Sequence, residues 1–412
     1  MRKRYAMPRA RRRKTGAAKA LLIICAAAAV FFWMSVQQHQ EYVIGDGGTK
    51  RAVFVKSAID CTLRVTPVFR ARESVLTASG QVGGQTAATA LSDVLLSSVP
   101  RSSLSAEQKN DAPPEGGSLE GEIIALSAEA GVLSDSLSEA VQTEDAAPPE
   151  NSYKIEDVTL CPKSAEGYTA YDGVYIINST KFRIDPESLL SAPLPFSYNP
   201  NEMQVLIIHT HATESYSPDG AAYYGENDST RTLDCDKNVV RVGEEMRRVL
   251  ESRGINVYHD MTVHDYPSYN GSYTRALETI NARLAEYPSI KIVLDVHRDA
   301  IIDSDNTKYR PVTEYGGVRF AQMLLCMGSS EGGLEHKDWQ TNLSFAVKLQ
   351  KKLCGAVPDL MRPVALKKER YNQHATPGSL IIEVGSDGNS LEEALASARL
   401  FAQATADVLK GE

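Results

Sequence analysis

Three short apolar runs in this chain each end in residues that can bind a metal ion or transfer a proton. The first run leads into His211 and Glu214, the second into His297, and the third into Glu383. Runs of four or five apolar residues are typical of strands buried on both faces of a parallel sheet. In open α/β sheets the ligand crevice lies beyond the carboxyl ends of such strands. The sequence therefore predicts one site at that edge of a sheet, built from two histidines and two glutamates.

The residue types of this site favour zinc-dependent hydrolysis. A catalytic Zn²⁺ ion commonly takes three His, Glu or Asp ligands and keeps one position for water. His211 and Glu214 stand three residues apart, and a turn after the strand can direct both into one space. His297 is then the natural third ligand. Glu383 is predicted to be the general base that takes a proton from the bound water and passes it to the leaving nitrogen.

Two positions in this ligand set have alternatives. His209 lies two residues before His211, and in an extended strand both side chains would share a face, so either could be the ligand. Asp234 and Asp236, just before the first long predicted helix, are alternatives to Glu214 as the carboxylate ligand. The three-residue spacing to Glu214 favours His211 over His209.

Charged neighbours could support the site. Asp295 and Asp299 flank His297 and could orient the ligands. Arg298 or Tyr216 could stabilise the negative charge that develops on a substrate carbonyl. Each residue alone also has an ordinary structural explanation, and only the combination favours catalysis. The remaining histidines lack such a context and are expected in loops or at the surface: His259, His264, His336 and His374.

Strands and helices that could position these residues alternate from about residue 200 onward. Strands are predicted at 205–208, 255–258, 290–296, 320–327 and 380–384, and helices at 238–253, 272–286, 342–353 and 390–409. A strand at 173–177 and a short helix at 185–190 precede them. This alternation predicts an α/β fold: a mixed, mainly parallel central sheet with helices on both faces.

The N-terminus predicts a membrane anchor. Residues 1–19 carry nine Lys or Arg and no acidic residue, and residues 20–36 carry no charge. Seventeen residues reach about 25 Å as a helix, the short end of a membrane span. The basic arm should stay cytoplasmic, which places the remaining chain outside. A cleavable signal peptide is the alternative, but bulky Phe31-Phe-Trp-Met34 is a poor cleavage context.

The composition of the remaining chain excludes some functions. After residue 19 it holds 35 basic and 52 acidic side chains, a net charge of −17, which argues against nucleic-acid binding. Its cysteines are scattered and form no CxxC pair, so neither a disulfide framework nor a zinc finger is predicted. We expect an exported segment of unknown role at 37–80, a flexible low-complexity spacer at 81–165, and a hydrolase domain at 166–412.

Four sequence blocks, in order, resemble the stage II sporulation protein P family. They are 208–216 (IHTHATESY), 237–243 (KNVVRVG), 295–300 (DVHRDA), and 371–373 (YNQ) with 377–385 (PGSLIIEVG). The resemblance covers roughly Gly173 to Leu409. It implies a fold and a zinc site like those of N-acetylmuramoyl-L-alanine amidases, with a His-x-x-Glu spacing like that of zinc carboxypeptidases. The amidase glutamate ligand precedes the first long helix, where this chain has Asp234-Cys-Asp236.

The resemblance also implies a function. It implies a membrane-anchored enzyme of endospore formers that cleaves the amide between N-acetylmuramic acid and L-alanine in peptidoglycan, and also peptide cross-links. It further implies action with stage II sporulation proteins D and M at the engulfing septal membrane. Two alternatives use the same chain differently: a zinc peptidase acting on cross-link peptides or proteins, and a catalytically silent scaffold for other septal wall hydrolases.

Overall fold

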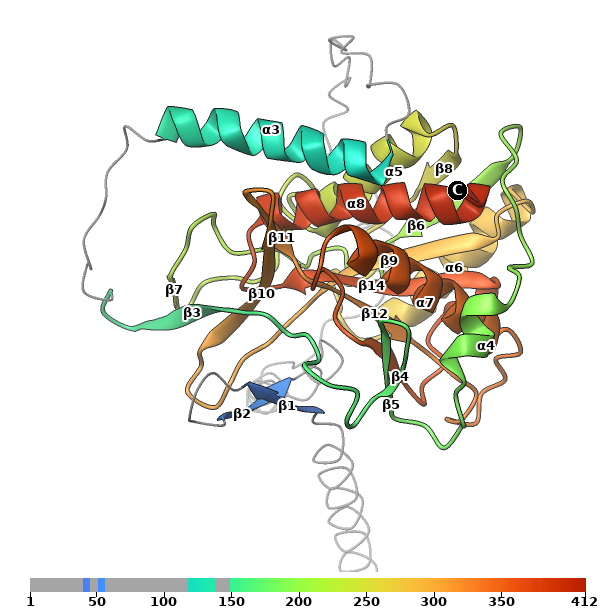
Figure 1. Ribbon diagram of the computed structural model, residues 1–412, viewed down its shortest axis with the longest axis horizontal. Coiled ribbons are helices and arrows are strands. Elements are labelled where there is room, and N and C mark those ends of the chain that lie inside the picture. Colours follow the sequence, from blue (N-terminus) through green and yellow to red (C-terminus); the bar gives the residue numbers. More distant parts are fainter. Residues whose placement is uncertain (1–39, 45–50, 56–117, 138–148) are drawn as a thin grey trace, which may run out of the picture.

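The protein has a mixed α/β fold built around an eight-stranded sheet (Figure 1). The computed structural model describes residues 40–44, 51–55, 118–137 and 149–412. In spatial order the strands are β4 (Thr169–Tyr171), β5 (Val174–Asn178), β13 (Val364–Leu366), β12 (Met323–Met327), β14 (Gly378–Ser386), β9 (Ile292–Asp299), β6 (Met203–Ile208) and β8 (Asn256–His259). Only β4–β5 and β12–β14 pair antiparallel in this sheet. The predicted mixed, mainly parallel sheet is thus confirmed.

Helices cover both faces of this sheet. Three helices pack on one face: α5 (Val239–Ser252), α7 (Trp339–Ala356) and α8 (Leu391–Lys410). α6 (Ser272–Glu286) packs on the other face. β6 shows why both faces are apolar, because Val205 and Ile207 join the α5 side whereas Leu206 and Ile208 join the α6 side. The predicted short helix is α4 (Pro186–Ser191), and its N-cap is Asp185, whose side chain accepts the backbone N–H of Ser188.

A second, four-stranded sheet lies beside the main one. Its order is β11 (Val318–Ala321), β10 (Lys308–Tyr315), β3 (Ser152–Val158) and β7 (Tyr223–Gly225). β3 pairs parallel with β10 and antiparallel with β7. The single strand predicted at 320–327 is instead divided between the two sheets, as β11 and β12. The chain changes sheets at Gln322, whose side chain accepts a hydrogen bond from the backbone of Leu160.

The body of the protein begins earlier than the predicted boundary at residue 166. Helix α3 (Leu119–Leu137) lies alongside α8 and β11 (Figure 1). Leu119, Ile123 and Leu126 are buried in the same core as α8. Their spacing forms one helical face, which the Ala-, Ser- and Glu-rich composition conceals. The described parts of the predicted spacer, residues 118–137 and 149–165, therefore belong to the folded body.

The predicted membrane anchor at 20–36 lies outside the described residues. Within the described part of the chain, no helix is long and apolar enough to cross a membrane. In the predicted exported segment 37–80, β1 (Gln40–Ile44) and β2 (Arg51–Val55) form an antiparallel pair.

Candidate active site

Strand alternation places His297 and Glu383 on the same face of the sheet. β9 and β14 are adjacent parallel strands, and Glu383 lies opposite His297 in their register. The chain neighbours of these residues, Val296 and Val384, point to the opposite face and belong to the core under α5, α7 and α8. The His297 and Glu383 side chains therefore point to the α6 side. Both residues are buried.

A turn after β6 brings His211 and Glu214 to the same place. The backbone N–H of Glu214 donates to the carbonyl of His211, at 3.1 Å. The ring centroids of His211 and His297 are 5.2 Å apart, and Glu214 Oε2 lies 3.4 Å from His297 Nδ1. The structure thus gathers the four predicted residues, two histidines and two glutamates, from three separate strand ends.

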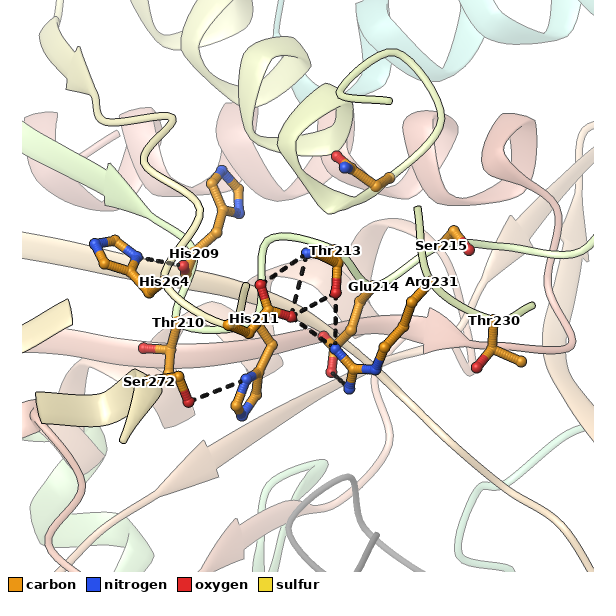
Figure 2. A network of polar contacts seen from close by, with 12 residues as sticks. His209, Thr210, His211, Thr213, Glu214, Ser215, Thr230, Arg231, His264 and Ser272 are labelled. Carbon is orange, nitrogen blue, oxygen red and sulfur yellow. Dashed lines mark hydrogen bonds and ion pairs between the residues drawn. The ribbon is translucent and has the colours of Figure 1, made fainter. Parts of the chain in front are cut away.

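His209 lies on the other face of the sheet. Its Nε2 is 2.9 Å from His259 Nε2, and its Nδ1 is 3.1 Å from the carbonyl oxygen of Val296. Figure 2 shows the rings of His209 and His211 pointing in opposite directions from the chain. The expectation that they would share a face was wrong, because β6 ends at Ile208 and the chain turns between them.

The two aspartates considered as rival ligands lie away from this cluster. Asp234 and Asp236 are exposed in the loop before α5. Asp234 Oδ2 is 3.0 Å from Lys237 Nζ, and Asp234 Oδ1 accepts the backbone N–H of Asp236. Nothing in their contacts joins them to Glu214 or to the histidines. The geometry therefore favours Glu214 over either aspartate as the carboxylate of the site.

The histidines expected in loops or at the surface are largely internal. His264 is buried, with Nδ1 2.8 Å from the carbonyl oxygen of His209. His259 links His209 to Glu244, and its side chain is 3% exposed. His336 is also buried. The contacts of His259 and His264 hold segments that are distant in sequence, which residue spacing alone does not reveal.

Asp295 supports His297 as expected, but Asp299 does not. Asp295 Oδ1 lies 2.9 Å from His297 Nε2, and the carboxylate also accepts from the backbone and hydroxyl of Thr210. Asp299 instead pairs with the buried guanidinium of Arg362, at 2.9 Å. Asp295 therefore contacts the His297 ring as an ion pair on its Nε2 side, the kind of position from which carboxylates commonly orient ligand histidines.

The structure gives Arg298 a different role from the predicted one. Its buried guanidinium donates to the carbonyl oxygens of Ser215, Asp299 and Thr230. Its backbone N–H donates to Glu214 Oε2, at 3.2 Å. These bonds hold together the chain segments around Glu214. The other predicted oxyanion group, Tyr216, donates its hydroxyl to the carbonyl of Val384.

The cluster contains groups in contrasting protonation states. Burial lowers the pKa of His211 to about 3, so this ring is neutral, as a metal ligand must be. Burial also raises the pKa of Glu383 to about 8. Burial opposes a charge on His297, but Asp295 and Glu214 outweigh it and hold the His297 pKa well above its usual value. Glu383 can thus hold or release a proton near neutral pH.

The residues fit a zinc ion in donor type and burial. Two imidazoles and one carboxylate are a recurrent zinc set. Glu383 Oε2 is buried without a hydrogen bond, whereas His297 Nε2 faces the Asp295 carboxylate in an ion-pair contact. Among the described residues, however, no three His, Cys, Asp or Glu side chains lie close enough together to hold a metal ion without moving. The arrangement is that of ion-paired side chains, which metal binding would rearrange.

Sequence reasoning missed three residues that surround the cluster. Arg231 Nη2 lies 3.3 Å from Glu214 Oε1 (Figure 2). Arg231 Nη1 lies 2.8 Å from Asp265 Oδ2. The Tyr269 ring stacks on His211, with centroids 4.3 Å apart, and the Arg231 guanidinium also lies over the Tyr269 ring, 4.8 Å from its centroid. Because all three occur in loops outside the strand ends, no periodicity identifies them.

These features define a mixed α/β protein with a buried His–Glu–His cluster and an adjacent protonatable glutamate. The model of the stage II sporulation protein P family matches residues 118–406, and the chain belongs to this family. A relative, the stage II sporulation protein P of Bacillus subtilis (strain 168), is 30% identical over 202 residues. That match spans 46% of this chain and 47% of the relative, about half of its length.

Solved amidase structures show a weaker likeness. The CwlD amidase from Clostridioides difficile, in complex with the GerS lipoprotein, is 13% identical with a TM-score of 0.29, covering 50% of this chain and 94% of that one. The catalytic domain of CwlV, an N-acetylmuramoyl-L-alanine amidase from Bacillus (Paenibacillus) polymyxa var. colistinus, is 12% identical with a TM-score of 0.28, covering 51% and 97%. At these TM-scores no residue role is transferred to this chain.

Proposed function

We propose that this protein is a cell-wall hydrolase of sporulating cells that cleaves the amide between N-acetylmuramic acid and L-alanine, with a second activity on peptide cross-links. Family membership supports the setting. The observation that carries the chemistry is the convergence of His211, Glu214 and His297 beside Glu383, whose pKa is raised to about 8. These are the groups that metal-assisted amide hydrolysis requires.

In this proposal His211, Glu214 and His297 hold a zinc ion. Bound zinc would polarise the scissile carbonyl and lower the pKa of water toward ~7. Asp295 keeps the His297 ring in place. Glu383, in the neighbouring strand, takes a proton from the attacking water and delivers it to the leaving nitrogen. Burial favours this role, because a carboxyl with a pKa near 8 exchanges protons readily at neutral pH.

The setting of the enzyme is part of the same proposal. Residues 20–36 anchor it in the cell membrane, the N-terminus stays in the cytoplasm, and the hydrolase acts outside, at the septal membrane during engulfment. Stage II sporulation proteins D and M are the proposed partners. Reporter fusions after Gln40 that are active only in the cytoplasm would overturn this topology.

The decisive experiment joins metal analysis to product analysis. The exported chain, residues 37–412, is purified with and without His297→Ala, and zinc is measured before digestion of purified peptidoglycan. An amidase releases free stem peptides, whereas a cross-link peptidase leaves them on the glycan. The proposal is supported if the unsubstituted chain binds zinc and releases free stem peptides while His297→Ala does neither. A chain that binds no zinc and releases nothing would instead favour the scaffold.

A further inference from the structure

Arg231 is a partly exposed cation at the site, and part of its hydrogen-bonding capacity is unused. Its Nη1 donates to Thr213 Oγ1 and Asp265 Oδ2, and its Nη2 donates to Glu214 Oε1. A guanidinium has five N–H donors, and these bonds use three of them. Within the described part of the chain, neither its Nε–H nor the second Nη2–H has a hydrogen-bond partner. Arg298, in contrast, is buried and bound to backbone carbonyls.

The unused Nε–H lies on the edge of the guanidinium that it shares with Nη2. Nε–H and one Nη2–H point in the same direction, so they form the fork that binds both oxygens of a carboxylate. The Arg231 side chain is 31% exposed, and its Nε is not among the buried atoms that lack a partner. This edge can therefore receive a group from solvent, while the other donors hold the guanidinium in place.

The fixed position of Arg231 defines where such a group would lie. Asp265 and Thr213 hold one end, and the guanidinium lies over Tyr269, 4.8 Å from its ring centroid. Nη2 is 3.3 Å from Glu214 Oε1. With a charge-assisted hydrogen bond of about 2.8 Å, a bound carboxylate would lie within about 6 Å of Glu214. Consecutive Cα atoms in a peptide are about 3.8 Å apart, so this reach corresponds to one or two residues.

We propose that Arg231 selects the substrate by binding, through its Nε/Nη2 edge, a carboxylate that lies one or two residues from the cleaved amide. The inference rests on the proposed function for the identity of the reaction. It adds that the substrate peptide is acidic beside the cleavage point, and that recognition depends on the fork as well as the charge. Arg231 thereby serves as a specificity residue, while Arg298 positions Glu214.

The test compares two synthetic substrates that differ only at that position, one with a free carboxylate and one with a carboxamide. We expect the exported chain to prefer the carboxylate by about 10- to 100-fold in kcat/KM, the range for hydrogen bonds to a charged group. Arg231→Gln should reduce this preference to near unity, and Arg231→Lys should retain only part of it. Arg248→Gln, a control at a partly exposed arginine paired with Glu245 on α5, should retain all of it.

A binding assay makes the result independent of turnover and of variant folding. Uncleavable versions of both peptides, with an N-methylated scissile amide, are titrated against the same proteins by fluorescence anisotropy, and zinc content is measured in each. Equal affinity of the unsubstituted chain for both peptides would overturn the inference, as would an undiminished preference in folded Arg231→Gln. A carboxylate preference in binding without zinc or cleavage would support Arg231 and reject the proposed reaction.

Discussion

His297 lies between two carboxylates, and this arrangement determines how the site should respond to metal. In the ion-paired state, Asp295 and Glu214 favour the protonated ring. A ligand histidine must be neutral, so zinc binding should release that proton. Glu383 differs because burial dominates and favours its neutral form. The protonated form is therefore favoured for both side chains, which leaves His297 charged and Glu383 neutral.

Substitutions should separate the metal ligands from the proton acceptor. His211→Ala or His297→Ala removes a proposed ligand, so zinc content and turnover should fall together. Glu383→Gln retains the shape but removes the proton acceptor, so zinc should stay while turnover falls by about 10²–10⁴-fold. Asp236→Asn, at the exposed aspartate before α5, should change neither quantity. Elemental analysis and peptidoglycan digestion measure both.

Glu214→Ala tests the carboxylate ligand, and loss of zinc is expected. If Glu383→Gln loses zinc while Glu214→Gln keeps zinc without activity, the two glutamates have the reverse roles. If the substitutions at His211, Glu214, His297 and Glu383 all leave digestion normal, the cluster is not the active site.

The raised pKa of Glu383 also predicts a pH dependence of stability. The folded metal-free chain binds this proton more tightly than the unfolded chain, with a pKa of about 8 against the usual 4.5. This contribution is therefore complete below pH 4.5 and is lost as the pH rises through 8. Between pH 5 and 9, the free energy of unfolding of the metal-free wild type should fall relative to Glu383→Gln. Denaturant titrations giving parallel pH profiles would contradict the assignment.

At the scale of elements, the contact between α5 and the end of β6 sets the position of the His209 turn. Gly243 faces His209 so closely that a Cβ atom there would lie 2.7 Å from the ring. His209 in turn bonds to the backbone of Val296, one residue before His297. The helix, the turn and the strand therefore form one packed unit beneath the site.

Gly243→Ala should destabilise the protein by about 1–3 kcal/mol, the usual cost of overpacking a buried contact. The matched control is Gly355→Ala in α7, where a Cβ meets no atom within 4 Å. That substitution should be neutral or stabilising by up to about 1 kcal/mol, because alanine favours helix. Urea unfolding of both variants measures the difference, and equal midpoints would show that the contact at Gly243 is not tight.

At the scale of the whole molecule, the segment before residue 166 completes the fold. α3 covers α8 with three buried apolar side chains, and β3 connects β10 to β7. β7 belongs to the segment that continues to Arg231 at the site. Removing residues 118–165 should therefore expose apolar surface and also loosen the chain that carries Arg231.

A fragment comprising residues 118–412 should unfold at a higher temperature than one comprising 166–412. Within the longer fragment, Leu126→Ala should cost about 2–5 kcal/mol, because it removes buried side-chain atoms. Ile124→Ala, at a position on the same helix that is 69% exposed, should change stability little. Calorimetry of the four proteins provides the measurement. Equal unfolding temperatures for the two fragments would restore the boundary at 166.

The sequence alone determined the central strands and helices of the main sheet and the chemical types of the site. Apolar runs identified β6, β9 and β14, and the segments between them were predicted as the helices α5, α6 and α8. These signals are local, since burial on both faces or on one face leaves a direct trace in the order of residues. The strand-end rule then led to His211, Glu214, His297 and Glu383, and the structure brings these four together.

Tertiary structure alone decided which neighbours join them. A turn separates His209 from His211. The Arg298 guanidinium donates to backbone carbonyls, whereas Arg231 contacts Glu214 from 17 residues away in the sequence. α3 belongs to the body despite a composition typical of a spacer, because three apolar residues on one face meet α8. The partners of a loop residue or of a sparse helical face depend on segments distant in sequence, and only the packed chain specifies those contacts.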